Sequence, residues 1–345
     1  MTTETPSPVL QTVSLGTHWP TIDPFLFVAH HHDHYPRGDG DLGPGPDELS
    51  GRSIGSDFSG RDGWSMYHGD RVPGFPQHPH RGFETITHVR RGLIDHADSI
   101  GATARFGPGD TQWMTAGRGV QHCEMFPLVN RDGPNTSELF QIWLNLPGAD
   151  KMVEPSFTML WNEHTPRVRV SDEAGIETAV TVIAGHVGEI RAPAPPSDSW
   201  AAKPDTDLAI WHITIPADGR WVLPRAAGAQ TVRVLYAYAG STVHIGEAEP
   251  IAAGTGAVVV AERDLEVAAG DAGIELLLLQ GRPIGEPVAR HGPFVMNTRG
   301  EITQAFEDYQ RTEFGGWPWP SPDPNHGPDA GRFAIHADGR RDAPS

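Results

Sequence analysis

The sequence has a single cysteine, Cys123, among its 345 residues. No disulfide can therefore form within one chain, and a reducing compartment raises no difficulty. Long hydrophobic runs are also missing, because no stretch approaches the roughly 18 apolar residues of a membrane-spanning helix. Residues 1–10 lack a basic segment followed by an apolar core, so they do not have the pattern of a secretion signal. We expect a soluble cytoplasmic protein that does not bind membranes.

Basic residues are scarce, since 26 Lys and Arg stand against 44 Asp and Glu, for a formal net charge of −18 with neutral histidines. The longest basic clusters are the pairs Arg90-Arg91 and Arg340-Arg341. A nucleic-acid backbone would be repelled by such a surface, and no basic stripe offsets the repulsion. Direct nucleic-acid binding is therefore not expected.

The chain is too long for one core and fits two domains of about 150 residues each with a tail. Forty Gly and 32 Pro, separated by β-branched and aromatic runs, favour many short strands joined by turns. We predict an all-β fold of two tandem β-barrels, with domains at 1–165, 166–298 and 299–345. The predicted strands are residues 21–28, 83–89, 103–106, 111–114, 138–146, 208–215, 231–239, 257–261 and 274–279.

One helix is predicted near the end of the chain, over residues 301–314. Its apolar residues repeat at helical spacing, Thr298 and Glu301 form a capping-box pattern, and Gly315 is placed to close it. The remaining residues, 317–345, are rich in Pro, Gly and Asp and are predicted to be a flexible or draped tail.

Residues 30–72 show no sustained period of two or 3.6 and are rich in Gly, Asp and Pro, so we predict a long inserted loop. It includes four histidines, His30, His31, His32 and His34. The simplest interpretation is a solvent-exposed loop. The alternatives are a lid over a site or a second, weak metal site.

Two close pairs of metal-ligand residues carry the chemistry of the sequence. They are His78-Pro79-His80 and His122-Cys123-Glu124. Side chains two residues apart share one face of a strand, so two such strands in one barrel would present three imidazoles and a carboxylate. That set suits a redox-capable divalent metal and leaves open positions for a substrate or dioxygen.

The identity of the carboxylate is open at this point. Glu84 shares the parity of His78 and His80, and it also points inward if that strand continues. Glu124 has the two-residue spacing from His122 in its favour. Cys123, between the two later ligands, would point away from the metal and be buried.

Several longer motifs resemble the pirin family of the cupin superfamily. The matching segments are residues 74–85 (GFPQHPHRGFET), 108–119 (PGDTQWMTAGRG), 122–125 (HCEM), 144–146 (LNL) with 151–155 (KMVEP), and 291–298 (HGPFVMNT). The resemblance implies two cupin barrels with one metal in the first, bound by His78, His80, His122 and Glu124. Glu84 would then be a supporting residue. The metal is expected to be Fe(II), with Cu, Ni, Mn or Zn as alternatives.

The resemblance also implies an activity, because some bacterial pirins are described as quercetin 2,3-dioxygenases. The expected partners are then a small aromatic substrate and dioxygen, and Glu124 is the candidate base that takes a proton from an enolic hydroxyl. A non-enzymatic regulatory protein that binds a protein partner is the main alternative. An oxygenase with a non-flavonol substrate is a further one. The second barrel is expected to be metal-free, since His212 and His244 stand alone there.

Overall fold

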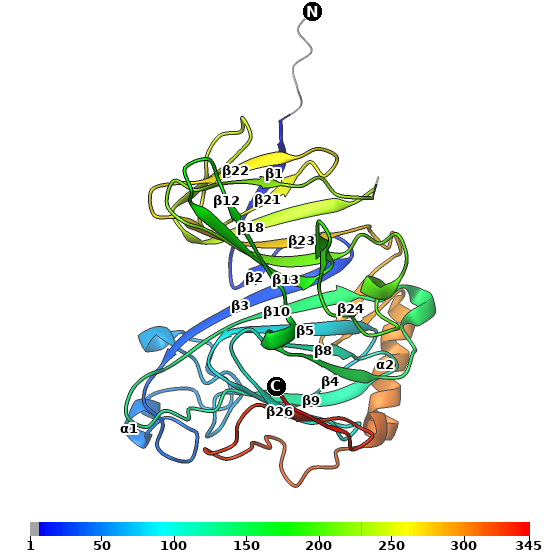
Figure 1. The fold of residues 1–345 in the computed structure, drawn as a ribbon. Coiled ribbons are helices and arrows are strands. Elements are labelled where there is room, and N and C mark those ends of the chain that lie inside the picture. The colour runs from blue at the N-terminus through cyan, green and yellow to red at the C-terminus, as the bar shows by residue number, and fades with distance from the viewer. Residues whose placement is uncertain (1–6, 229) are drawn as a thin grey trace, which may run out of the picture. The chain divides into compact units, whose positions relative to one another are not determined.

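The structure is a computed structural model that describes residues 7–228 and 230–345, and most of its regular secondary structure is β-strand (Figure 1). The strands fall into two compact units. We call them the N-terminal barrel, made of His30–Glu163 and Glu286–Ser345, and the C-terminal barrel, made of the described part of Met1–Ala29 and of His164–Gly285. The predicted all-β, two-barrel class is confirmed.

Two sheets make up the N-terminal barrel. The first has the order β11-β8-β5-β10-β3 and the second the order β27-β26-β7-β6-β9-β4, with antiparallel pairing. Their bounds are β3 Phe25–Tyr35, β4 Gly74–His80, β5 Phe83–Arg91, β6 Ile94–Asp98, β7 Thr103–Phe106, β8 Thr111–Thr115, β9 Val120–Met125, β10 Asn135–Asn145, β11 Ser156–Leu160, β26 Phe333–Ile335 and β27 Arg341–Asp342.

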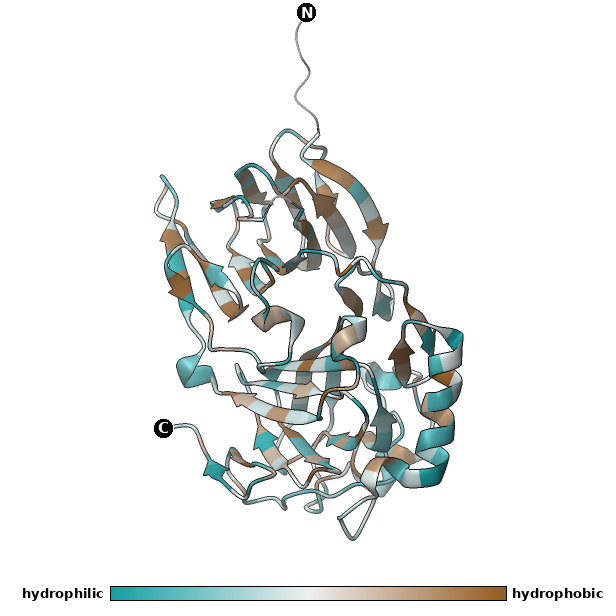
Figure 2. Ribbon diagram, turned by 90° about the vertical axis from the view of Figure 1, so that its right-hand side faces the viewer, coloured by the Kyte–Doolittle hydropathy of each residue, from teal (hydrophilic) through white to brown (hydrophobic). Residues whose placement is uncertain are grey.

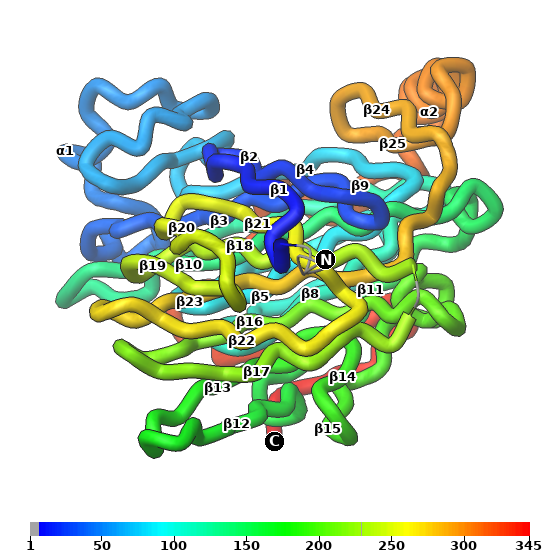
Figure 3. Tube along the Cα trace, turned by 90° about the horizontal axis from the view of Figure 1, so that it is seen from above, coloured from blue at the N-terminus to red at the C-terminus, as the bar shows by residue number. Residues whose placement is uncertain are grey.

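Shorter elements complete this barrel. They are the short helix α1 Pro46–Leu49, the 3₁₀ turns Arg61–Gly63, Gly148–Asp150, Asn162–His164 and Glu313–Gly315, the hairpin β24 Ala289–His291 with β25 Phe294–Met296, and the helix α2 Arg299–Thr312. Figures 1 and 3 show α1 at one end of the barrel and α2 with its hairpin at the other.

The C-terminal barrel has a seven-stranded sheet, β1-β21-β18-β23-β16-β13-β12, and a four-stranded sheet, β17-β22-β19-β20. Its alternating apolar residues form one core that includes Trp211, Ile213, Leu235 and Leu278. The bounds are β1 Val9–Ser14, β2 His18–Trp19, β12 Arg167–Ser171, β13 Glu177–Ala184, β14 His186–Val187, β15 Ile190–Arg191, the 3₁₀ turn Trp200–Ala202, β16 Ala209–Ile215, β17 Arg220–Leu223, β18 Val232–Gly240, β19 Thr242–Ile245, β20 Ile251–Ala252, β21 Thr255–Val259, β22 Leu265–Ala269 and β23 Ile274–Gly281.

The compact units divide the chain differently from the predicted ranges. Strand β1 pairs with β21, so residues near the N-terminus add a strand to the second barrel. Residues after Glu286 belong to the first unit. The division into 1–165, 166–298 and 299–345 remains a prediction, while the contacts of the chain follow the two barrels described above.

The histidine-rich segment is a strand rather than part of a loop, so the predicted loop over residues 30–72 is wrong at its start. Strand β3 continues to Tyr35, and its side chains alternate: Asp33 and Tyr35 are buried while His34 is exposed. The inward residues of this stretch include a histidine and an aspartate, which a search for apolar alternation passes over. The irregular insertion therefore starts at about residue 36.

The single predicted helix is confirmed as α2, with a capping box between Thr298 and Glu301. The α-helix ends earlier than predicted, because Glu313 adopts the left-handed conformation at its C-cap and a 3₁₀ turn follows through Gly315. Figure 2 shows hydrophobic patches among the hydrophilic residues of α2, and its buried residues, Ile302 and Ala305, are spaced to share one face, as in an amphipathic helix. No helix in the described part of the chain is long and apolar enough to cross a membrane.

Residues 317–345 were predicted to be a flexible or draped tail, and the structure shows the draped form. Strand β26 pairs with β7 through Phe333↔Arg105, and the segment, red in Figure 1, runs along the sheet that contains β9. Trp317 and Trp319 pack against a cluster of buried residues that includes Cys123. The predicted burial of Cys123 is confirmed, and burial raises the pKa of its thiol.

Candidate metal centre

Neighbouring strands bring three histidines together inside the N-terminal barrel. Strands β4 and β9 are antiparallel partners, and His78 lies directly opposite His122 in their register. Opposite residues project to the same side, and His80 follows at the next inward position of β4. The ligand nitrogen atoms of His78, His80 and His122 all lie within 4.8 Å of one another. The predicted H-x-H pair and the later histidine therefore form one group that could hold a metal.

The ring nitrogens are arranged as a metal site requires. His78 Nδ1 lies 2.8 Å from the carbonyl oxygen of Pro76, and His80 Nδ1 lies 3.3 Å from that of Pro293. Each Nδ1–H can donate to its carbonyl, which fixes the tautomer and leaves Nε2 as the lone-pair donor. Both nitrogens of His122 are buried and have no hydrogen-bond partner among the described residues. Orphaned imidazole nitrogens of this kind fit a bound metal.

The three imidazoles are neutral around pH 7. Burial lowers the pKa of His78 to about 4, and it holds the pKa values of His80 and His122 well below the ordinary value. Neutral imidazole is the form that binds a divalent metal, so no proton has to be displaced from these rings near neutral pH.

Glu124 lies on the same inner face but outside the three-histidine group. Its Oε1 accepts a hydrogen bond from the Thr87 hydroxyl at 2.7 Å, and its Oε2 accepts one from the Gln141 amide at 2.9 Å. Burial raises its pKa, and the two donors and His96 partly oppose that shift. The carboxylate is thus held in place beside the histidines by two strands of the opposite sheet.

Glu84 lies on the face of β5 that points away from the three histidines. Strand β4 ends at His80 and β5 starts at Phe83, so the parity does not continue from one to the other. The break is at Gly82, which has φ +85° and approaches Val295 so closely that a Cβ atom would lie 2.0 Å from its carbonyl oxygen. The strand does not continue from His80 to Glu84, so the condition under which Glu84 would point inward is not met. Its Oε1 accepts hydrogen bonds from Trp113 Nε1 at 3.1 Å and from Thr115 Oγ1 at 2.7 Å.

Lys151, from the KMVEP motif, holds the corner between β4 and β5. Its buried Nζ donates to the carbonyl oxygen of Gly82 and to Asn145 Oδ1, both at 2.7 Å, and lies 3.3 Å from the carbonyl oxygen of Val295. Val295 belongs to β25, and Pro293 in the same hairpin contacts His80. The motif therefore positions the hairpin that orients a metal-ligand candidate.

Sequence reasoning missed several residues that line the site. Thr87 and Gln141 are opposite each other in the β5–β10 register, and the Trp143 ring lies 5.3 Å from that of His80. His96 lies opposite Glu124, and its ring centroid is 5.6 Å from that of His122. The period-two alternation of β10 gives Gln141 and Trp143 a common face, but alternation alone does not say which face is inward.

His31 belongs to a second polar group near this site. The Tyr67 hydroxyl donates to Asp33 Oδ2 at 2.8 Å, and His31 Nδ1 lies 2.9 Å from the same hydroxyl oxygen. Because the only proton of Tyr67 goes to Asp33, His31 must donate through Nδ1–H. The Ser65 backbone N–H donates to Asp33 Oδ1 at 2.9 Å, so both carboxylate oxygens have donors.

Asp33 should make stability depend on pH. Burial raises its pKa to about 6, from an ordinary value of 3.8. A raised acid pKa means that the folded state keeps the proton longer, so stability contributed by this group is lost as pH rises from about 4 to 6. We expect the free energy of unfolding of the wild type, minus that of Asp33→Asn, to fall by roughly 3 kcal/mol between pH 4 and 7. Urea unfolding at four pH values measures the difference, and a constant difference would contradict the expectation.

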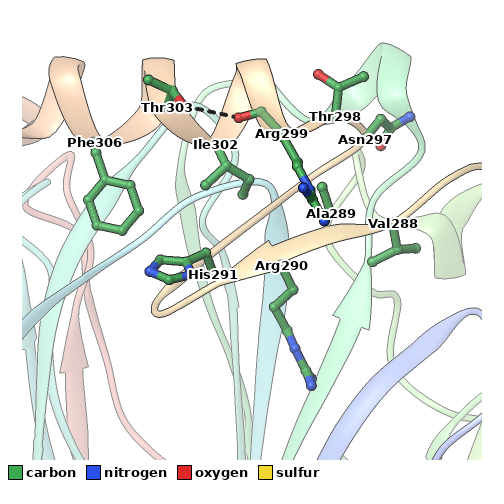
Figure 4. Close-up of a pocket in the computed structure, with 10 residues that line it drawn as sticks. All are labelled: Val288, Ala289, Arg290, His291, Asn297, Thr298, Arg299, Ile302, Thr303 and Phe306. Carbon is green, nitrogen blue, oxygen red and sulfur yellow. Dashed lines mark hydrogen bonds between the residues drawn. The ribbon is translucent and has the colours of Figure 1, made fainter.

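An open pocket of about 920 Å³ lies between the hairpin β24–β25 and α2 (Figure 4). His291 points toward Phe306 there, whereas Arg290 points away from the helix. Its polar side chains do not converge on one point, and none of His78, His80 and His122 lines it. This pocket is therefore not the candidate site.

Two barrels, one of them with a three-histidine group able to hold a metal, define the chain as a bicupin. A model of the pirin family matches residues 9–144, and a model of the pirin C-terminal cupin domain matches residues 210–315. The chain belongs to the pirin family.

Relatives support this assignment along most of the chain. It is 38% identical over 246 residues to a Pseudomonas aeruginosa protein provisionally named as a quercetin 2,3-dioxygenase, a match that covers 70% of this chain and 79% of that protein. It is 34% identical over 259 residues to human pirin, which covers 72% and 80% of the two chains. A crystal structure of quercetin 2,3-dioxygenase from Acinetobacter baumannii shares the fold, with a TM-score of 0.67 and 24% identity over 89% of this chain and 98% of that one.

Proposed function

We propose that this pirin is a metal-dependent dioxygenase that acts on a flavonol or a similar enolic aromatic substrate. The observation that carries the proposal is the group of three neutral, buried imidazoles beside a buried carboxylate. His78, His80 and His122 would hold one divalent metal, Fe(II) in the first instance, and Glu124 would complete the set. A relative that bears the quercetin 2,3-dioxygenase name supports the reaction class.

A bound redox-capable metal would supply a Lewis-acid position for the enolic oxygen of the substrate and a means of engaging dioxygen. The protein residues supply the proton chemistry. Glu124 Oε2 faces the Gln141 amide and Oε1 faces the Thr87 hydroxyl, so the carboxylate is pre-oriented and need not reorganise when it accepts the hydroxyl proton of the substrate. Its raised pKa strengthens it as a base relative to an exposed glutamate.

The aromatic residues beside the histidines suit a planar substrate. Trp143 and Phe83 pack on each other with ring centroids 4.2 Å apart, and both rings lie about 5 Å from that of His80. The Phe75 ring lies 6.4 Å from that of His78. Ring faces placed around a metal position exclude water and orient a flat ligand.

Turnover with different metals tests the proposal. The protein is loaded anaerobically with iron, copper, nickel or manganese, mixed with quercetin and exposed to air, while absorbance and carbon monoxide are recorded. We expect quercetin loss with stoichiometric carbon monoxide for at least one metal, and none for the metal-free protein. If no metal supports turnover, the regulatory alternative with a protein partner is favoured. Consumption of a non-flavonol enol, without consumption of quercetin, would favour an oxygenase with a non-flavonol substrate.

A further inference from the structure

The inserted segment, residues 36–73, packs aromatic side chains against Phe75 of β4, a neighbour of the metal-ligand candidate His78. Phe58 is 55% exposed, and its ring centroid lies 5.5 Å from that of Tyr67. Tyr67 stacks on Phe75 at 5.0 Å, and Phe75 reaches His78 at 6.4 Å. A continuous series of rings therefore runs from the surface of the insertion to a metal-ligand candidate.

Phe75 faces the interior of the barrel. It lies opposite Glu124 in the β4–β9 register, and an irregularity between Phe75 and His78 keeps both on the face of Glu124 and His122. The half-buried Phe75 side chain is thus shared between the metal centre and the insertion. The aromatic wall, as we call Phe58, Tyr67 and Phe75, has one end at the histidines and the other at solvent.

The His31–Tyr67–Asp33 group stands against the same wall. The ring of His31 lies 5.0 Å from Tyr67 and 5.8 Å from Phe75, both edge to face. Asp33 is 4% exposed, and together with Tyr67 it fixes the ring orientation of His31 and puts its proton on Nδ1. An oriented imidazole at an aromatic surface is suited to recognise a phenolic hydroxyl.

We propose that the aromatic wall and His31 form a recognition subsite for the outer, hydroxylated ring of a planar aromatic ligand whose other end lies at the metal centre. The inference rests on the proposed function for that metal anchor. Phe75 would contact the ring face, His31 would bind the hydroxyl, and Tyr67 and Asp33 would act as positioning residues for His31. His31 is connected to His78 through two ring contacts, His31 with Phe75 and Phe75 with His78. A ligand of two or three joined rings can cover this span.

A pair of flavonols tests the subsite without turnover. The protein is loaded with zinc, which is redox-inert, and titrated anaerobically with quercetin or with galangin, which lacks the outer-ring hydroxyls. Tryptophan fluorescence reports the dissociation constants. We expect Tyr67→Phe and His31→Ala to weaken quercetin binding about three- to tenfold, the value of one hydrogen bond, and to change galangin binding by less than about twofold. Phe75→Leu should weaken both ligands.

Two control variants change residues of the same chain segments, the insertion and β3. Ile54→Ala removes another exposed apolar side chain of the insertion, and His34→Ala removes an exposed histidine from β3. Neither should change either affinity. Equal effects of Tyr67→Phe on the two ligands, or no effect, would overturn the inference, as would the absence of binding by both flavonols. These results are distinct from failure of the proposed function, because flavonol binding that depends on Tyr67 without turnover by any metal would leave the subsite standing.

Discussion

Replacing His80 by alanine should remove the metal. The wild-type protein, purified and reloaded, is expected to bind about one divalent ion per chain, and His80→Ala about a tenth of that or less. The physical reason is that His80 supplies one of three imidazoles whose nitrogens lie within 4.8 Å of one another, and the described residues contain no second group of this kind. Elemental analysis after gel filtration measures the metal directly.

The matched control is His244→Ala, since His244 is an exposed histidine on β19. It should keep full metal content, as should His212→Ala, whose imidazole hydrogen-bonds to Tyr238 and Glu275 in the C-terminal barrel. Full occupancy in His80→Ala would contradict the site. Loss of metal in His244→Ala would show that the C-terminal barrel binds it, against the expectation that this barrel is metal-free.

Replacing Glu124 by glutamine should abolish turnover while most of the metal is retained. The three histidines remain in Glu124→Gln, but a neutral amide cannot take the proton of the enolic hydroxyl. General-base contributions of about 10²- to 10⁴-fold set the expected loss in rate. Turnover and metal content are measured on the same sample, so that a rate loss caused by missing metal is recognised.

Glu84→Gln provides the matched control for the carboxylate. Glu84 is buried like Glu124, but it accepts hydrogen bonds from Trp113 and Thr115 on the opposite face of β5. We expect it to cost about 1–3 kcal/mol of stability and to leave metal content and turnover per bound metal unchanged. The reverse pattern, with turnover lost in Glu84→Gln and kept in Glu124→Gln, would assign the base to Glu84.

Ligand spacing was the part of the site that the sequence made predictable. His78, His80 and His122 converge because H-x-H on one strand and a third histidine on its partner fix a common face. Counting alternate residues cannot be carried from His80 to Glu84, because the chain turns between β4 and β5. Gly82 breaks the strand between His80 and Glu84, and alternation counted through such a break assigns the wrong face.

The histidine-rich strand could not be recognised from apolar alternation. Its inner positions include Asp33 and His31, which are held among protein groups by Tyr67 and Ser65 rather than by apolar packing. Tyr67 lies more than thirty residues along the chain from both. Similarly, Thr87 and Gln141 reach Glu124 from another sheet, and only the register of three strands brings them together. Long-range pairing of this kind has no local sequence signal.

Anomalous diffraction from an iron-loaded crystal, soaked anaerobically with quercetin, tests the central claim most directly. We predict one anomalous peak within bonding distance of the Nε2 atoms of His78, His80 and His122, with the flavonol between that peak and Phe75. A peak elsewhere in the chain, or a flavonol bound away from the three histidines, would contradict the account.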